Sequence, residues 1–364
     1  MSNTKDSLTY VALRKFKKNF WGVLSFWVIV FIGLISLSAY VIAPDDSQNA
    51  NQMHLSIHSQ RPGFEVQMLQ IPSNENQDQS LISKWLFGNK NADIEIPISE
   101  YSVQNEYLIY TEYASDGLKG EEKSVNLDRF PNKDYRSHIQ TKSFLFGTDK
   151  YGRDLLSRIL VGSRISFSIG FVAVLISLVI GIFMGSVAGY YRGRIDNIIM
   201  WIINVTWSIP TLLLVIAITL ALDKGFWQVF IAVGLTMWVE VARVVRGQII
   251  STKEMQYVTA ARALGFNDFR IITKHILPNI LAPIIVISAA NFAAAILIES
   301  GLSFLGIGAQ PPMASWGAMI KDHYNYIILG KPYLALIPGI CIMILVMAFM
   351  LIGNALRDAL DVKT

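Results

Sequence analysis

Long hydrophobic stretches alternate with polar segments along the chain. Residues 21–42 carry no charged side chain, and five later stretches are nearly as apolar. An α-helix rises about 1.5 Å per residue, so each stretch can cross a hydrocarbon core of roughly 30 Å. The pattern predicts an all-α polytopic membrane protein with six transmembrane helices, at residues 21–42, 165–190, 195–222, 226–245, 280–298 and 333–356.

One long polar segment, residues 43–142, separates the first hydrophobic stretch from the others. It is rich in Asn, Gln, Ser, Asp and Glu, and apolar residues alternate with polar ones in several short runs, as in half-buried strands. The pattern predicts a β-rich extracytoplasmic insert with strands near residues 54–58, 64–68, 93–96 and 103–113. His54 and His58 would lie about 13 Å apart on such a strand, so we expect solvated histidines rather than a metal site.

The composition supports a membrane protein. The 364 residues are 52% hydrophobic and 16% charged, with a mean hydropathy of +0.41 and a formal net charge of +4. Basic side chains concentrate in residues 1–20, in the loop at 191–194 and between residues 243 and 274. Because Lys and Arg favour the cytoplasmic side, we expect both termini there and the insert outside. The single cysteine, Cys341, excludes an intramolecular disulfide.

Residues 143–164 form a distinct segment before the second hydrophobic stretch. Leu155, Leu156, Ile159 and Leu160 would share one helical face, with Arg153, Asp154, Ser157 and Arg158 away from it. This amphipathic pattern predicts a short helix in the outer membrane interface. The two arginines oppose that placement, but the short loops favour it by their charge.

Small and kinking residues shape the next spans. Gly181, Gly185 and Gly189 recur every four residues, which permits close helix packing. Pro210 predicts a kink in the third span. Glu240 lies in the last turns of the fourth span, where we expect it to pair with Arg243 near the interface.

A polar loop at residues 246–279 connects the fourth and fifth spans. Residues 255–264 favour a helix by composition, and Gly265 can end it because glycine accepts a positive φ. Asn267 or Asp268 can cap a second helix, which Pro278 stops. The segment predicts a short helix–turn–helix with a small, approachable surface at Ala260–Ala261 and Gly265.

This loop resembles the "EAA" loop of membrane subunits of ABC importers. Ala260, Ala261, Gly265, Leu277 and Pro278 fall in register with that motif, whereas Thr259 replaces its Glu and His275 its usual Ile. The resemblance implies an ATPase-coupling loop made by Thr259, Ala260, Ala261, Arg262, Gly265, Leu277 and Pro278.

Two further strings resemble the C-type permease subunits of oligopeptide and dipeptide importers. They are GTDKYGRD at the start of residues 147–164, and ESGLSFLGIGAQPP followed by SWG in residues 299–317. Glu299, at the edge of a span, and Ser300 are candidate pathway or gate residues, because ionisable groups at membrane depth are usually functional. A hydrated interface carboxylate that orients the loop is the alternative.

The resemblance implies one membrane subunit of a bacterial importer in the inner membrane, with a core at residues 165–364. The partners would be the lipid bilayer, a second permease subunit, two ATP-binding subunits and an extracytoplasmic solute-binding protein, and no nucleic acid. The chain has no G-x-x-x-x-G-K-[ST] loop and no evident catalytic arrangement. We therefore expect a non-catalytic subunit without cofactors, with ATP bound by the partner subunits.

Three alternatives remain open. A related importer of nickel or metal complexes has no His- or Met-rich motif in its favour. A stand-alone secondary transporter predicts intramembrane charge pairs or inverted repeats, and the sequence offers one glutamate and no clear repeat. A membrane-anchored scaffold for the insert would not need six spans.

Overall fold

The computed structural model describes residues 8–72, 79–90, 93–114, 120–223 and 225–360. These residues divide into two units that are described separately. The helical unit comprises the described residues of 1–32, 166–310 and 340–364, and the insert unit comprises those of 33–165 and 311–339. The first span, the second span and the last span contribute residues to both units, as helices α2 (Phe20–Ile42), α4 (Leu155–Tyr191) and α12 (Tyr333–Leu360).

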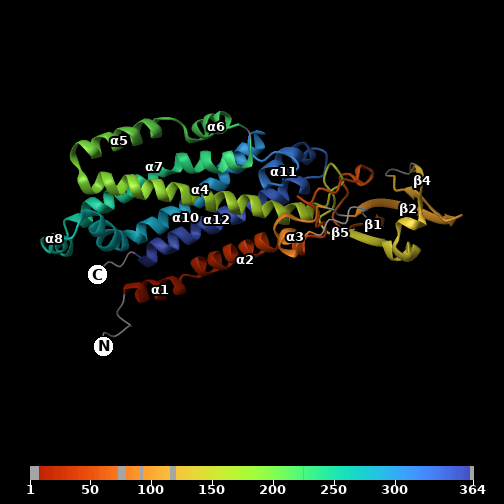
Figure 1. Cartoon of the computed structure of the whole chain (residues 1–364), viewed down its shortest axis with the longest axis horizontal. Coiled ribbons are helices and arrows are strands. Elements are labelled where there is room, and N and C mark those ends of the chain that lie inside the picture. Colours follow the sequence, from red (N-terminus) through yellow and green to blue (C-terminus); the bar gives the residue numbers. More distant parts are fainter. Residues whose placement is uncertain (1–7, 73–78, 91–92, 115–119, 224, 361–364) are drawn as a thin grey trace. The chain divides into compact units, whose positions relative to one another are not determined.

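Apolar helices dominate the helical unit (Figure 1). Five helical stretches among the described residues are long and apolar enough to cross a membrane: Phe20–Ile42, Leu155–Tyr191, Phe226–Lys253, Asp268–Phe304 and Tyr333–Leu360. A pair of shorter helices, α5 (Gly193–Ser208) and α6 (Thr211–Ala221), makes a sixth if it counts as one broken span. The six expected spans correspond to these five stretches and the broken pair. A basic helix, α1 (Leu8–Lys18), precedes α2.

The third expected span is broken rather than kinked. Helices α5 and α6 meet at an angle of 94°. Ile209 is extended, with φ −90° and ψ 128°, as expected for a residue that precedes proline, and Pro210 precedes the first residue of α6. The position of the break at Pro210 could be predicted from the sequence, but the large angle between the two helices could not.

The glycine stripe of α4 packs against α7 (Phe226–Lys253). A Cβ added at Gly185 would lie 2.5 Å from the carbonyl oxygen of Ala242, and one at Gly181 would lie 2.5 Å from Cβ of Val241. Both distances are too short for any side chain, so the small residues set the close approach of the two helices. Helix α7 also binds α5, because Arg246 Nη2 donates to Asp196 Oδ2 at 2.8 Å.

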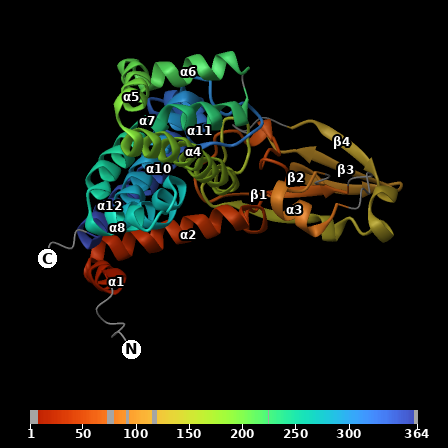
Figure 2. The same cartoon turned by 60° about the vertical axis from the view of Figure 1, so that its left-hand side comes forward.

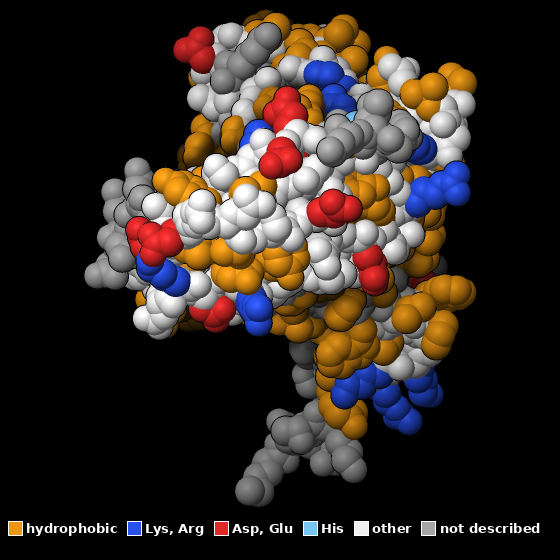
Figure 3. Space-filling model, turned by 90° about the vertical axis from the view of Figure 1, so that its right-hand side faces the viewer, with side chains coloured by type: hydrophobic (Ala, Val, Ile, Leu, Met, Phe, Trp, Pro, Cys, Tyr) orange, Lys and Arg blue, Asp and Glu red, His pale blue; other side chains and the backbone are white. Residues whose placement is uncertain are grey.

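The insert unit contains the expected β-rich domain (Figure 2). Its antiparallel sheet has the strand order β4-β3-β2-β1-β5. Side chains of these strands, including Leu69, Ile98 and Leu108, form a buried hydrophobic core. In Figure 3, which faces the side where Figure 1 draws the strands, acidic side chains are scattered rather than gathered in one patch. The strands are β1 (Phe64–Ile71), β2 (Ile94–Gln104), β3 (Tyr107–Glu112), β4 (Glu122–Asn126) and β5 (Ile139–Phe144).

One expected strand is absent. Residues 54–58 form a 3₁₀ turn, Leu55–Ile57, instead of a strand. His54 is buried, so the expectation of a solvated histidine was wrong there, whereas His58 is exposed. The alternation that suggested a strand reflects a turn that buries His54 and Ile57 and turns His58 outward.

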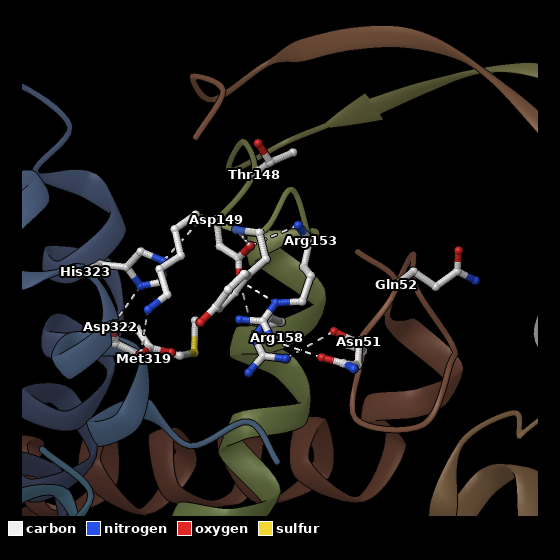
Figure 4. A network of polar contacts seen from close by, with 12 residues as sticks. Asn51, Gln52, Thr148, Asp149, Arg153, Arg158, Met319, Asp322 and His323 are labelled. Atoms are coloured by element: carbon white, nitrogen blue, oxygen red, sulfur yellow. Dashed lines mark hydrogen bonds and ion pairs between the residues drawn. The ribbon is translucent and has the colours of Figure 1, made fainter. Parts of the chain in front are cut away.

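The segment at residues 143–164 also differs from expectation. Helix α4 runs without a break from Leu155, so there is no separate short helix. The polar residues that were expected away from the apolar face are buried: Arg153 Nε donates to Asp149 Oδ2 at 2.6 Å, and Arg158 Nε lies 3.8 Å from the same oxygen (Figure 4). Arg153 and Arg158 therefore share the carboxylate of Asp149 and are not solvated charges on the polar side of an interfacial helix.

Residues 147–164 contact the SWG end of the second string and the helix that begins there, within the insert unit. Trp316, the first residue of α11 (Trp316–His323), donates from Nε1 to the carbonyl oxygen of Ile159 at 3.0 Å. Lys150 Nζ donates to Asp322 at 3.0 Å, and the His323 ring accepts from the Lys150 backbone (Figure 4). These residues therefore hold the start of α4 against α11.

Candidate functional site

Residues 246–253 of the expected loop continue helix α7, and the loop itself begins with helix α8 (Gln256–Ala263), which ends in a glycine-dependent turn. The backbone N–H of Gly265 donates to Arg262 O at 3.0 Å, and that of Phe266 donates to Ala261 O at 3.2 Å. This pair of bonds is the Schellman motif, which requires a positive φ at the residue after the cap. Gly265 has φ +78°, as the sequence predicted.

A second helical segment returns the chain to the membrane helices. Asn267 caps α9 (Asp268–Arg270), because its Oδ1 accepts from the Arg270 N–H at 2.9 Å. The helix continues as a π-helical segment, η6 (Ile271–Ile276), and a 3₁₀ turn, η7 (Leu277–Ile280), before α10 (Leu281–Phe304). The sequence had suggested that Pro278 stops this helix. Pro278 instead lies in the 3₁₀ turn, where it tightens the helix without stopping it.

The inner side of this helix–turn–helix packs against other helices of the helical unit. Five of its side chains are buried in one hydrophobic cluster with residues of α4, α7 and α10. Leu277 packs against the same cluster. The five are Val258, Ala261, Ile271, Ile276 and Ile280. Since these contacts are extensive, the loop moves with the helices on which it is mounted.

Polar contacts fix the loop to the end of α4. The Tyr190 hydroxyl donates to Asp268 Oδ1 at 2.7 Å, and Lys253 Nζ donates to the Tyr190 carbonyl oxygen at 2.7 Å. The Arg262 guanidinium lies 5.9 Å from the centroid of the Tyr190 ring. One tyrosine therefore joins α4 to both arms of the loop.

The unusual His275 has a structural partner. Its ring stacks on Phe266 at 5.5 Å with an interplanar angle of 14°, and the Arg270 guanidinium lies 4.2 Å from the Phe266 ring centroid. Phe266 thereby gains two ring contacts that hold the turn against the second arm. This stacking gives the histidine a packing role at a position where the motif usually has Ile.

The outer side of the loop is exposed and apolar around the glycine. Leu264 is 74% exposed and Phe269 75%, and a Cβ added at Gly265 would meet no atom within 4 Å. The two alanines face opposite ways, because Ala260 is exposed and Ala261 is buried. Exposed apolar groups around an accessible backbone are typical of a protein-binding surface. Leu264 and Phe269 were not among the residues expected to form this surface, although both are large apolar residues in a polar loop.

Glu299 occupies a buried turn at the end of α10. The Ser303 hydroxyl donates to Glu299 Oε1 at 2.7 Å and accepts from the Ala309 N–H at 3.1 Å. Glu299 is buried, so it is not a hydrated carboxylate, and through Ser303 it holds the glycine-rich turn that follows. Ser300 lies half-buried beside it. Neither residue lines a cavity described below, and their role in a pathway stays a prediction.

The expected pair between Glu240 and Arg243 does not form. Arg243 Nη2 instead donates to Asn204 Oδ1 at 2.8 Å, and its guanidinium carbon lies 3.4 Å from the centroid of the Trp207 ring. Both partners are on α5, so the arginine points across to that helix. Glu240 is exposed and lines a hollow of about 150 Å³ between α5, α6, α7 and α10.

These features define a helical, multi-pass membrane protein with a protruding coupling-type loop. The family model of the binding-protein-dependent transport system inner membrane component matches residues 159–364. The chain therefore belongs to that family. A second model, the N-terminal transmembrane domain of oligopeptide transport permease C, matches residues 7–62.

Relatives with transport names are similar over 60–66% of this chain. The dipeptide transport system permease protein DppC of Bacillus subtilis (strain 168) is 44% identical over 218 residues, which is 60% of this chain and 68% of that protein. The oligopeptide transport system permease protein OppC of the same organism is 39% identical over 239 residues, or 66% of this chain and 75% of that protein. A chain of the inward-facing MetNI methionine ABC transporter has a TM-score of 0.47 and 18% identity, covering 56% of this chain and 95% of that one, a likeness too remote to add to the assignment.

Proposed function

We propose that this chain is a peptide-importing permease subunit that forms half of a translocation pathway for dipeptides or oligopeptides. The relatives named as dipeptide and oligopeptide permeases support this substrate class. The family description, with its binding protein, supports import, because such a protein captures solute outside and delivers it. A second permease subunit would complete the pathway.

The observation that carries the coupling role is the loop around Gly265. Its outer side presents Leu264, Phe269 and an open glycine backbone, and its inner side is buried among the helices. A partner that grips the outer side therefore moves the spans by the rigid connection on the inner side. We propose that two ATP-binding subunits grip this loop and its counterpart on the second permease.

Catalysis would belong to those ATP-binding subunits. This chain would hold no cofactor and would convert their closure into alternating access of the pathway. In this proposal the membrane is the bacterial inner membrane, with both termini and the coupling loop in the cytoplasm. The β-rich insert would then lie outside, on the side where the solute-binding protein delivers the peptide.

Reconstitution tests the proposal directly. The chain is assembled in liposomes with the second permease, the two ATPases and the binding protein encoded beside it, and uptake of radiolabelled dipeptides and longer peptides is measured. Uptake that requires both ATP and the binding protein supports a peptide importer. ATP-driven uptake of a metal complex without peptide uptake would favour the metal-importer alternative, and uptake without ATPases would favour a secondary transporter.

A further inference from the structure

Glu240 lies beside the break between α5 and α6, which falls near the middle of the third expected span, residues 195–222, and this makes its surroundings informative. It lies near the middle of α7, about 21 Å from Phe226 and about 20 Å from Lys253 at 1.5 Å per residue. An ionised carboxylate at this depth is costly in hydrocarbon, so it must face protein or water. The exposed side of Glu240 therefore belongs to an internal surface of the complex.

No described residue neutralises this carboxylate. Arg243, one turn further along α7, is held by Asn204 and Trp207, and no other Lys, Arg or His among the described residues forms an ion pair with Glu240. The charge thus remains available to a group that is not part of the described chain.

The hollow in front of Glu240 lies at the break between α5 and α6. Ile209 and Thr211 line it from the two sides of the break, and Thr206 and Thr236 add hydroxyl groups to its wall. Backbone outside a helix is tolerated at membrane depth only where it is buried in protein or lines a water-filled cavity. The break, the hydroxyls and the carboxylate together indicate a wet internal surface.

We propose that Glu240 is a binding site for the α-ammonium group of a passing peptide. A carboxylate that lines a hollow complements a primary ammonium, because hydrogen bonds between charged groups are about twice as strong as those between neutral groups. A hollow of about 150 Å³ accommodates a chain terminus and not a whole peptide. The permease would thereby favour a free amino terminus, in addition to any selection by the binding protein. This inference rests on the proposed peptide transport.

The test compares Glu240→Gln with the wild-type complex in proteoliposomes. Two peptides without lysine are used, one with a free and one with an acetylated amino terminus, each at a concentration that saturates the binding protein. Uptake of the free-amine peptide should fall about tenfold, the effect of losing one hydrogen bond to a charged group, with little change for the acetylated peptide. Asp223→Asn, the same chemical change at an exposed site outside the hollow, should alter neither rate.

Each outcome has a distinct meaning. Equal slowing of both peptides, or unchanged uptake of both, overturns the inference. Loss of the second permease from purified Glu240→Gln complexes also overturns it, because Glu240 would then pair with that subunit. Glu240→Asp should retain part of the preference for a free amine. If the wild-type complex transports no peptide, it is the proposed function that fails.

A different feature of the insert unit carries a second inference. The short helix α3 (Leu81–Phe87) buries none of its side chains. Leu81 is 84% exposed and Ile82 69%, and Trp85 lies on the same side one turn later. So many exposed apolar groups on one short helix require a cover.

The position of α3 identifies that cover. Gly88, which ends α3, lies against the ring of Tyr40 near the end of α2, since an added Cβ would be 2.8 Å from it. The Asn89 N–H donates to the Asp46 carbonyl oxygen at 2.8 Å. Helix α2 is long and apolar enough to cross a membrane, and its last residues, Val41 and Ile42, are exposed. Helix α3 is therefore fixed at the level where α2 leaves the membrane.

We infer that α3 is an interfacial anchor that inserts its apolar side into the lipid leaflet at the C-terminal end of α2. Amphipathic helices of this kind combine Trp and aliphatic groups with basic residues. Lys84 flanks this side of α3, one turn after Leu81, and Lys90 follows the helix, with no acidic residue between residues 79 and 90. This charge favours anionic headgroups.

Site-specific fluorescence tests the anchor. Single cysteines at Ile82 and, as a matched control, at Lys84 are labelled with an environment-sensitive dye in a Cys341→Ala complex in nanodiscs. The Ile82 probe should be blue-shifted and quenched by lipids spin-labelled at a shallow position, and the Lys84 probe much less. An Ile82 probe that is unquenched in the assembled complex, or quenched only as much as the Lys84 probe, overturns the inference.

Discussion

The hydroxyl of Tyr190 donates a hydrogen bond to Asp268 Oδ1 at 2.7 Å, which joins the last turn of α4 to the second arm of the loop around Gly265. Tyr190 is also buried in the cluster that holds Val258 and Ile271. The loop is therefore attached to α4 by packing and by a directed bond. Displacement of the loop must displace α4 or break that bond.

Removing this bond should loosen coupling without preventing assembly. Tyr190→Phe keeps the buried ring and loses the hydroxyl, which donates to a carboxylate, so the change is worth about 1.5–3 kcal/mol. We expect ATPase subunits to co-purify at the wild-type level while more ATP is hydrolysed per peptide imported. Tyr191→Phe, at an exposed neighbouring ring, is the matched control and should leave the ratio unchanged. An unchanged ratio in Tyr190→Phe would remove the bond from the coupling path.

The exposed apolar pair around the turn should contribute directly to ATPase binding. Leu264→Ser and Phe269→Ser remove exposed side chains, so the chain itself should remain as stable as the wild type. If these side chains are buried by the partner, each substitution should weaken ATPase binding by about 1–2 kcal/mol. Co-purification and titration of the ATPase onto the permease measure this. Leu145→Ser, an exposed leucine of the insert unit, is the control.

The buried His54 predicts a pH dependence of stability. Burial, and then the nearby positive charge of Lys142, lower the pKa of His54 from 6.5 to about 4. Between those values the unfolded chain binds a proton that the folded chain does not, so stability should fall as the pH decreases from 6.5 to 4, by at most ~1.4 kcal/mol per pH unit. Thermal unfolding of the complex at pH 7 and pH 5 measures this. His54→Gln should show a smaller drop, and exposed His58→Gln the wild-type drop.

Topology is tested by thiol labelling in intact spheroplasts. Single cysteines at Ser80 and Asp223 in a Cys341→Ala background should react with an impermeant reagent, because the placement of Lys and Arg puts the insert and the α6–α7 turn outside. Cysteines at Gly193 and Asn267 should react only after permeabilisation. Labelling at Asn267 from outside would place the coupling loop on the wrong side for an ATPase.

Much of the helical architecture could be predicted because it depends on properties that are local in sequence. Hydrophobic length located the spans, and glycine at position 265 located a turn whose φ of +78° only glycine adopts easily. The stripe of glycines predicted close packing, although the sequence could not name α7 as the partner. The features that could be predicted were those that depend on the properties of a residue and of its near neighbours in the sequence.

What the sequence missed depends on contacts between distant residues. Arg153 and Arg158 looked solvent-facing, but Asp149 allows them to be buried. Glu240 and Arg243 looked like an ion pair at helical spacing, but Asn204 and Trp207 on another helix compete for the arginine. His54 was assigned to a strand by alternation alone, which cannot distinguish a strand from a short turn.

Substitutions on the outer side of the loop separate coupling from folding. Ala260 is exposed, so Ala260→Glu should reduce ATPase binding, whereas Thr259→Glu restores the usual motif residue and should be tolerated. Ala261 is buried, so Ala261→Glu should lower the amount of folded protein instead. Protein yield and ATPase co-purification distinguish the two effects.

The most direct measurement is ATPase co-purification and substrate-stimulated ATP hydrolysis of the Gly265→Asp complex. A Cβ added at Gly265 meets no atom within 4 Å in this chain, and the positive φ costs roughly 1 kcal/mol, so the protein should insert at a near-normal level. We predict that it binds much less ATPase and that stimulated hydrolysis and peptide uptake are strongly reduced. Full ATPase binding and full uptake in Gly265→Asp would contradict the claim that this loop couples the chain to ATP hydrolysis.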